Sequence, residues 1–123
     1  MLTRPQKFGY QGESIAERHL KKLGYKILER NYRTKLGEID IIAKDKKTIV
    51  FVEVKTRKSG QFGNPKGAVT PAKQRKISMV ALEYLKTMNR HDTKARFDVV
   101  AVMANRDTPQ IEIIKNAFEL AYG

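Results

Sequence analysis

The stretch GEIDIIAKDKKTIVFVEVKTR, from Gly37 to Arg57, sets three ionisable residues among isoleucine, valine and phenylalanine. These residues are Asp40, Glu53 and Lys55. A charged side chain is costly to bury among apolar ones unless an opposite charge, hydrogen bonds or a metal ion compensates it. Two carboxylates and an amine in such surroundings indicate a site where the three groups act together, provided that the fold brings them to one place.

The two halves of this stretch read as β-strands that form a hairpin. EIDIIA and TIVFVEVKT have the composition of strands and are joined by a charged turn at Asp45–Lys47. Because side chains alternate along a strand, Glu53 and Lys55 lie on one side of it. A turn centred on its two lysines makes residue 45 face 48 and places Asp40 directly opposite Glu53. A slip of one residue puts the two acids on opposite faces, and the pattern leaves this slip open.

Two opposed carboxylates repel each other, so the predicted register needs a compensating group. Either one acid is protonated, or a lysine or arginine neutralises the pair, or a divalent cation sits between them. Oxygen ligands of this kind suit Mg²⁺ or Mn²⁺ better than zinc. The alternative is a purely structural salt-bridge cluster of Asp40, Glu53 and Lys55 at the edge of the sheet.

A helix predicted for residues 9–24 offers a third acid. Its apolar stripe recurs at helical spacing, and Gly24 ends it. Glu13 lies at the border of the stripe and is expected to face the sheet, whereas Glu17 lies further round and is expected to face solvent. The stripe consists of Ile15, Ala16, His19, Leu20 and Leu23. We therefore interpret His19 as a residue at the edge of the core rather than as a ligand.

A second helix begins after Thr70, which caps it, with Pro71 at the first helical position. Cations in its first turn are disfavoured by the helix dipole, a cost that is tolerable if phosphates bind there. These cations are Lys73, Arg75 and Lys76. Gln74 lies on the inward side of the helix and is a candidate to touch substrate or water.

Strands are also predicted for residues 25–33, for the apolar run at 96–103 and for QIEIIKN, which a short AFELAY tail follows. SGQFGNPKG reads as a loop. The predicted order is α-β-β-β-α-β-β, an α/β fold with helices packed on a mixed sheet, in a single domain spanning residues 1–123. Asp98 is assigned a structural role, accepting a hydrogen bond near a strand end.

The composition limits which binding partners and which cellular compartment are expected. The 123 residues include 25 Lys and Arg against 13 Asp and Glu, which gives a formal net charge of +12. This excess favours a polyanionic partner, nucleic acid first and an anionic membrane second. Without cysteine, disulfides and thiolate zinc sites are excluded. No apolar run approaches the roughly 20 residues of a membrane span. We expect no signal peptide and a cytoplasmic protein that stays outside the membrane.

The order Glu13, Asp40 and Glu53-Val54-Lys55 resembles the PD-(D/E)XK nuclease superfamily, which includes restriction endonucleases and archaeal Holliday-junction resolvases. The chain is more closely similar to the YraN-like family, whose members carry NYR…GEIDLIA…VFVEVKTR almost as NYRTKLGEIDIIAKDKKTIVFVEVKTR stands here. The likeness also covers GESIAERHLKKLGYKIL, KQRKI and RFDVVAV, about residues 9 to 103. It implies a restriction-endonuclease-like αβββαβ core with a mixed sheet flanked by helices.

The resemblance also implies roles for the residues of the strand pair. Asp40 and Glu53 would be ligands of Mg²⁺ or Mn²⁺, and the backbone carbonyl of Val54 would add a third ligand. Lys55 would orient or polarise the attacking water and offset charge at the phosphate. One position departs from the superfamily pattern, because Ile39 stands where the proline of the PD motif would be.

The two predicted helices contribute further residues by the same resemblance. Glu13 matches a first-helix acid that assists a metal, as a ligand and in catalysis. Gln74 resembles a second-helix glutamine found in some members. Basic residues that flank the site in sequence are expected to hold a nucleic-acid backbone electrostatically. They are Lys35, Arg57, Lys58, Lys66, Lys73, Arg75 and Lys76.

Three functions are open at this level. The first is a metal-dependent endonuclease that hydrolyses phosphodiester bonds in DNA, including branched or otherwise structured DNA. The second is a non-catalytic nucleic-acid-binding module on a nuclease fold, and the third is a basic accessory protein of a ribonucleoprotein or DNA-processing complex. The acids favour the first, because a binding module has no physical use for carboxylates facing phosphates. A homodimer would suit a symmetric four-way junction, although no segment demonstrates one.

Overall fold

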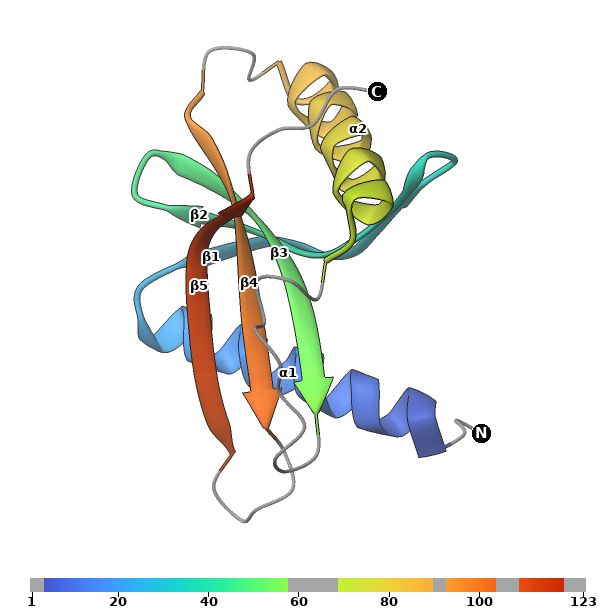
Figure 1. Cartoon of the computed structure of the whole chain (residues 1–123). Coiled ribbons are helices and arrows are strands. Elements are labelled where there is room, and N and C mark those ends of the chain that lie inside the picture. Colours follow the sequence, from blue (N-terminus) through green and yellow to red (C-terminus); the bar gives the residue numbers. More distant parts are fainter. Residues whose placement is uncertain (1–3, 58–68, 90–92, 104–108, 119–123) are drawn as a thin grey trace.

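The structure of the protein, a computed structural model, describes residues 4–57, 69–89, 93–103 and 109–118, with side chains from Gly12 onward. Its elements follow the order predicted from the sequence (Figure 1). They are α1 (Arg4–Lys22), β1 (Lys26–Thr34), β2 (Gly37–Asp45), β3 (Thr48–Arg57), α2 (Pro71–Thr87), β4 (Ala95–Met103) and β5 (Gln110–Phe118). The α/β fold with a restriction-endonuclease-like αβββαβ core is therefore confirmed, and β5 is added at one edge of the sheet.

The described strands form one mixed sheet in the order β1-β2-β3-β4-β5. Neighbours are antiparallel except for β3 and β4, which run parallel because the chain returns through α2 between them. β2 and β3 pair in the predicted register, from Asp45 opposite Thr48 to Ile41 opposite Val52. Asp40 and Glu53 therefore stand at the first position beyond the last paired residues of this ladder.

Each face of the sheet is covered by one helix, and α1 crosses behind the strands in Figure 1. The face under α1 buries Ala16, Leu20, Ile41, Val50, Val52 and Val100. The face under α2 buries Ile42, Phe51, Ile77, Val80 and Tyr84. Since side chains alternate along β3, Glu53 and Lys55 follow Phe51 on the α2 face. The chemistry-bearing side of β3 is therefore the side that α2 overhangs.

The end of α1 fixes the entry of the chain into β1. The Tyr25 N–H donates to the Leu20 carbonyl and the Gly24 N–H to the Lys21 carbonyl, both at 3.0 Å. This is a Schellman motif, and Gly24 adopts the left-handed conformation that the motif needs, with φ 92°. The helix runs over Arg4–Lys22, so it begins earlier than the predicted residues 9–24. It also ends two residues earlier, because Leu23 and Gly24 form this turn.

Gly12 brings α1 into close contact with β3. A methyl group added at Gly12 would lie 3.0 Å from the Cβ of Thr56 and would overlap the hydroxyl of that residue. A residue without a side chain is needed for this approach. This contact sets how closely α1 approaches β3. It thereby positions Glu13, the next residue of the helix.

The start of α2 is fixed by its cap and by the β1–β2 hairpin. Thr70 Oγ1 accepts a hydrogen bond from the Lys73 backbone N–H at 3.2 Å, and Pro71 occupies the first turn, as predicted. The tip of the hairpin lies beside the first half of α2 (Figure 1). A methyl group added at Gly37 would lie 3.5 Å from Val80 and 3.8 Å from the Cβ of Lys76. The hairpin thus packs against α2 near Lys76 and Val80, beyond the first turn of the helix.

β5 runs further than the sequence predicts. QIEIIKN is followed by a predicted tail, but the strand continues through Ala117 and Phe118. Asn116 adopts φ 52°, and the pairing with β4 shifts register between Phe97 and Val99. This irregularity turns Ala117 into the core and breaks the alternation that marks a strand in sequence.

Candidate active site

Asp40 reaches across the end of the β2–β3 ladder. Its Oδ2 accepts a hydrogen bond from the backbone N–H of Val54 at 2.8 Å. Burial raises the pKa of Asp40 to about 7, and the charge of Glu53 adds to the rise, against the opposing effect of the Val54 N–H. The register and this electrostatic coupling indicate that the two carboxylates lie near each other, as the hairpin predicts.

Glu53 is almost enclosed, with 6% of its side chain exposed, and lysines from two elements contact it. Lys55 Nζ lies 3.6 Å from Glu53 Oε1 on the same strand. The first-turn position of Lys73 predicts a contact with phosphate, but its ammonium contacts the same oxygen of Glu53 in the structure. Of the three ways to compensate the opposed acids, neutralisation by lysine is the one that the structure shows for Glu53.

The surroundings shift the pKa values of the two lysines in opposite directions. Burial lowers the pKa of Lys55, and the neighbouring charge of Lys73 lowers it further, while Glu53 opposes the change. Burial also works against the charge of Lys73, but the hydrogen bond and the charge of Glu53 outweigh it and raise the pKa of that lysine. Lys73 is therefore firmly cationic, and Lys55 is the lysine whose proton is held less tightly.

Glu13 joins the group from α1. Burial raises the pKa of Glu13, Arg30 opposes the rise, and the charges of Glu38 and Glu53 add to it. Its charge also contributes to the raised pKa of Asp40. Glu13 thus faces the sheet as predicted. We refer to Glu13, Asp40, Glu53, Lys55 and Lys73 as the acidic site.

Asn31 orients Glu13, and the sequence pattern did not reveal it. When its amide nitrogen faces the carboxylates, Asn31 donates to Glu13 Oε1 at 2.7 Å and to Glu38 Oε1 at 3.2 Å. Asn31 has φ 51° in the middle of β1, a conformation that asparagine tolerates better than most residues. The signal in the sequence is an asparagine inside a predicted strand, where this residue type is depleted.

The prediction that Glu17 faces solvent is wrong. Glu17 is half-buried, and its Oε2 lies 3.6 Å from Arg30 Nη1 of β1. The helical stripe locates the apolar face of α1, but it does not tell which strand lies along the flank of the helix. Because β1 follows α1 and packs beside it, this flank is covered and holds an ion pair.

Gln74 is turned toward the backbone before its own helix. Its Nε2 donates to the Val69 carbonyl at 2.8 Å, which ties the first turn of α2 to the chain that enters it. Gln74 is half-buried, as its inward position predicts. Its contact with substrate stays a prediction, and the hydrogen bond to Val69 gives it a structural role as well.

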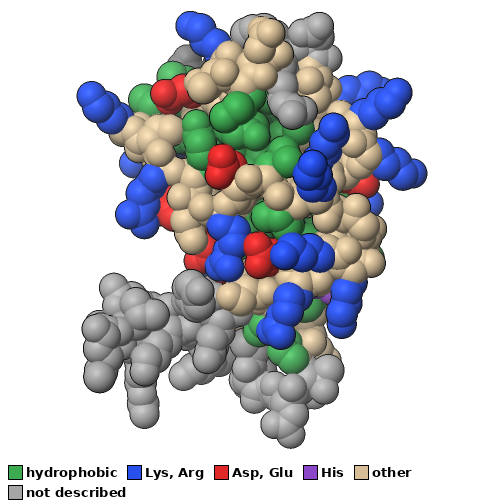
Figure 2. Space-filling view, turned by 180° about the vertical axis from the view of Figure 1, so that it is seen from behind, with side chains coloured by type: hydrophobic (Ala, Val, Ile, Leu, Met, Phe, Trp, Pro, Cys, Tyr) green, Lys and Arg blue, Asp and Glu red, His purple; other side chains and the backbone are tan. Residues whose placement is uncertain are grey.

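The predicted phosphate-binding residues surround the acidic site in part. Lys35 is exposed in the β1–β2 turn, and Arg75 and Lys76 are exposed on α2. Arg57 continues the side of β3 that carries Lys55, and its Nη1 donates to the Thr56 carbonyl at 3.0 Å. Lys58 and Lys66 lie outside the described residues. Figure 2 shows lysine and arginine side chains both along the outline and within the face that it presents.

The donors of the acidic site fit a hard divalent cation. Asp40 and Glu53 offer carboxylate oxygens from neighbouring strands, and Val54, whose backbone N–H donates to Asp40, follows Glu53 on β3. The carbonyl of Val54 as a third ligand stays a prediction. Among the described side chains, no group of three or more histidines or acids is arranged to hold a metal ion. Two carboxylates completed by backbone and water are nonetheless a common donor set for Mg²⁺. Both lysines contact Glu53, whereas Asp40 pairs with no ammonium group among the described side chains, so a further positive charge is accommodated beside Asp40.

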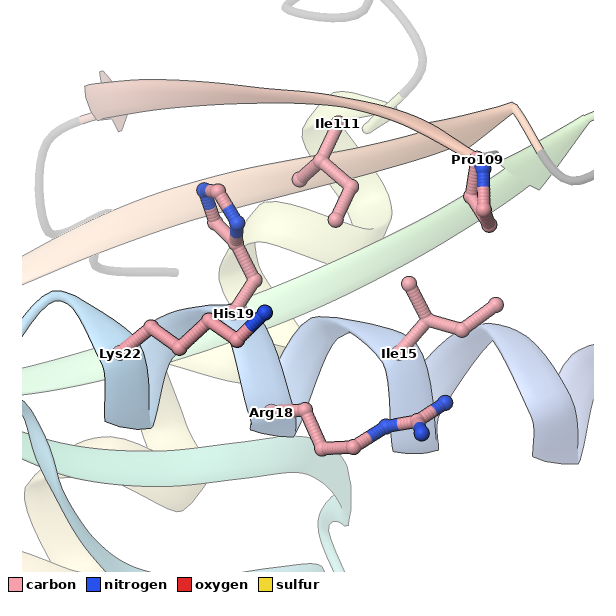
Figure 3. Close-up of a pocket in the computed structure, with 6 residues that line it drawn as sticks. All are labelled: Ile15, Arg18, His19, Lys22, Pro109 and Ile111. Atoms are coloured by element: carbon pink, nitrogen blue, oxygen red, sulfur yellow. The ribbon is translucent and has the colours of Figure 1, made fainter.

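A concavity lies between α1 and the start of β5 (Figure 3). It measures about 330 Å³, and His19 and Ile111 point into it from opposite walls. The full lining is Ile15, Arg18, His19, Lys22, Pro109 and Ile111. His19 is half-buried at the margin of the core, as its place in the helical stripe predicts. This groove contains no carboxylate among its lining residues and lies apart from the acidic site.

Neither described helix is long and apolar enough to cross a membrane.

Comparison with known proteins gives a family match across the whole site. The profile of a family described as "Uncharacterised protein family UPF0102" matches residues 12–102. A UPF0102 protein of Geobacter metallireducens is 56% identical over 122 residues, covering 99% of this chain and 100% of the relative. UPF0102 proteins of Syntrophus aciditrophicus and Geotalea uraniireducens are 52% and 58% identical, covering 99% and 93% of this chain and 96% and 91% of their own lengths. The matched region includes every residue of the acidic site.

Proposed function

This chain belongs to the UPF0102 family, the YraN-like family, and we propose that it is a Mg²⁺- or Mn²⁺-dependent endonuclease that hydrolyses phosphodiester bonds in DNA, branched or otherwise structured DNA in particular. One observation carries the proposal. Asp40 and Glu53 converge beyond the end of the β2–β3 ladder, and the Lys55 ammonium lies 3.6 Å from Glu53 on the same strand. This convergence occurs in a chain with a net charge of +12.

The residues of the chain would divide the chemistry among them. Asp40 and Glu53 would hold a divalent cation, which would lower the pKa of the attacking water and offset the negative charge at the phosphate. Lys55 would position the attacking water by a hydrogen bond and offset negative charge on the phosphate oxygens. Glu13, held by Asn31, would accept a hydrogen bond from water bound on its side of the site.

The surroundings of the site favour recognition of the DNA backbone. Lys35, Arg75 and Lys76 are exposed near the acidic site and match phosphates by charge rather than by base sequence. The two described helices are separated in the chain by three strands, so they do not form a helix-turn-helix motif. The chain also lacks the cysteines of a zinc finger. Specificity would therefore come from the shape or the ends of the DNA.

Cleavage assays test the proposal. Plasmid, single-stranded, flap and four-way-junction DNA are incubated with the wild-type protein and Mg²⁺ or Mn²⁺. We expect cleavage of at least one of these substrates and a loss of about 100-fold or more in Asp40→Ala and in Lys55→Ala. Glu83→Ala and Lys86→Ala, which change exposed residues of α2 by the same charges, serve as matched controls and should cut like wild type.

Two results would contradict this expectation. Cutting that persists in both site variants would come from a contaminant. DNA binding without cleavage of any substrate by the wild type would favour the second candidate, a non-catalytic nucleic-acid-binding module. That candidate has one observation in its favour, because Lys55 and Lys73 both contact Glu53 and compensate its charge.

A further inference from the structure

Lys73 joins the acidic site across a gap between two elements. Its backbone belongs to the first turn of α2, where its N–H donates to Thr70 Oγ1 at 3.2 Å. Its side chain extends from there to Oε1 of Glu53 on β3. The helix start is therefore fixed, while the long side chain remains 43% exposed and free to take other rotamers.

Lys55 contacts the same oxygen of Glu53, but it differs from Lys73 in its position in the fold and in its exposure to solvent. It lies on the same strand as Glu53, two residues away, and only 18% of its side chain is exposed. The sheet therefore fixes the backbone of Lys55 on the same face as Glu53, and little of the Lys55 side chain reaches solvent. Lys73 differs, since it comes from another element and borders solvent.

A divalent cation at Glu53 cannot share the carboxylate with both lysines without strong repulsion. Two ammonium groups and a dication around one carboxylate would place like charges within contact distance of one another. The lysine that is able to leave is the exposed one. Once it leaves Glu53, its position at the N-terminus of α2 is unfavourable for a cation unless an anion such as a phosphate accompanies it.

We propose that Lys73 is the exchangeable counter-ion of the acidic site: its ammonium holds Glu53 while no divalent cation is bound, and cation binding displaces it toward a DNA phosphate. This inference rests on the proposed function, because it takes Asp40 and Glu53 as the cation ligands. It adds an order of events, in which cation binding comes first and frees a phosphate contact.

The two binding events must then be coupled. A cation that frees Lys73 raises the affinity for DNA, and DNA that captures Lys73 raises the affinity for the cation by the same factor. Lys76 lies one turn further along α2, is exposed and carries the same charge. It makes a matched control, because it is expected to contact phosphate in either state.

Titration calorimetry with Mn²⁺ in the absence of DNA gives the first test. Lys73→Gln should bind Mn²⁺ about five- to tenfold more tightly than wild type, because no ammonium has to be displaced. Lys73→Arg, which retains the charge, and Lys76→Gln should stay within about twofold of wild type. Equal or weaker Mn²⁺ binding by Lys73→Gln relative to Lys76→Gln would overturn the proposal, since it would mean that Lys73 supports the carboxylate in the bound state.

Binding of four-way-junction DNA with and without Ca²⁺, a cation that seldom supports phosphodiester hydrolysis, gives the second test. Lys73→Gln should match wild type without Ca²⁺ and bind roughly threefold less tightly with it, because only the cation releases Lys73. Lys76→Gln should lose affinity equally in both conditions. An equal loss for Lys73→Gln in both conditions would also overturn the proposal.

Asp40→Asn separates this inference from the proposed function. If wild type binds Mn²⁺ and Asp40→Asn does not, the cation site stands whatever Lys73 does, and failure of the Lys73 variants then counts against the exchange alone. If wild type does not bind Mn²⁺, both proposals fall together.

Discussion

Two groups of acids that include a buried carboxylate lie on neighbouring strands of the sheet, and their charges are compensated in different ways. In the acidic site, Asp40 accepts one backbone N–H, and Glu53 is held by the ends of two lysines. On the other face of the sheet, Asp98 is 1% exposed and accepts from Arg96 Nε at 3.1 and 3.2 Å through its two oxygens. Asp98 pairs with Val52, one residue before Glu53, so the two environments are neighbours along the sheet.

The second group, which we call the arginine network, consists of Arg96, Asp98, Asp45 and Tyr25. Arg96 Nη2 donates to Asp45 Oδ2 at 3.0 Å and to the Tyr25 hydroxyl at 2.7 Å, and the guanidinium lies over the Tyr25 ring. The Asn116 N–H donates to Asp98 at 3.2 Å, which confirms that Asp98 accepts a hydrogen bond. A planar guanidinium held from several sides is a fixed structural group.

The contrast shows how a buried carboxylate reveals its role. Burial raises the pKa of Asp98 as it raises that of Asp40, so a shifted pKa does not separate the two sites. The compensating groups do separate them. Asp98 has a fixed cation of its own, whereas Asp40 forms no ion pair with any side chain among the described residues. Acids left in this condition are suited to a cation that arrives from solution.

The largest expected effect on stability comes from a substitution that breaks the arginine network. Arg96→Met should lower the free energy of unfolding by about 3–5 kcal/mol, because it leaves Asp98 buried without its cation. Urea denaturation followed by circular dichroism at neutral pH measures the change. Lys94→Met, two residues earlier and exposed, is the matched control and should change stability by less than about 0.5 kcal/mol. A loss below about 1 kcal/mol in Arg96→Met would remove the distinction between the two sites.

Asp40→Asn is expected to have a smaller effect on stability, and of opposite sign: at neutral pH it should make the protein more stable than wild type. The pKa of Asp40 is about 7 in the folded protein against an ordinary value of 3.8, so the folded state holds the proton more tightly than the unfolded state. Its contribution is therefore complete at acidic pH and is lost as the pH rises through about 7. Between about pH 5 and pH 8, wild type should lose roughly 2–3 kcal/mol of stability relative to Asp40→Asn.

Denaturation of both proteins across this pH range, with the difference taken at each pH, measures the effect and cancels the titration of other groups. Addition of Mg²⁺ should restore stability to wild type at the upper end of the range and leave Asp40→Asn unchanged. A wild type that is as insensitive to pH as Asp40→Asn would mean that the lysines compensate Asp40 as completely as Arg96 compensates Asp98.

The smallest effect on stability is expected outside both groups, at Arg75. Arg75→Gln should leave the free energy of unfolding within about 0.5 kcal/mol of wild type, because the residue is exposed. Its effect should appear in DNA binding, where one lost phosphate contact lowers the slope of log affinity against log salt by about 0.9. An unchanged slope would place the DNA away from the first turn of α2.

The sequence located Asp40, Glu53 and Lys55 because strands carry their geometry in their alternation. A single register follows once the turn is placed between Lys46 and Lys47, and Lys46 takes the left-handed φ of 57° that such a tight turn requires. Asn31 and Glu17 were beyond this reasoning, since their partners come from other elements.

By itself the sequence determined the order of the elements and the α2 cap, and it reduced the hairpin to two registers, because each depends on residues near one another along the chain. The structure selected the register that sets one carboxylate opposite the other. Only the tertiary structure decided that Lys73 rests on Glu53, that Asn31 holds Glu13 and that Arg96 ties Asp45 to Asp98. These contacts join side chains from elements distant in the chain, and their geometry is set by how the helices lie across a twisted sheet, which no local pattern encodes.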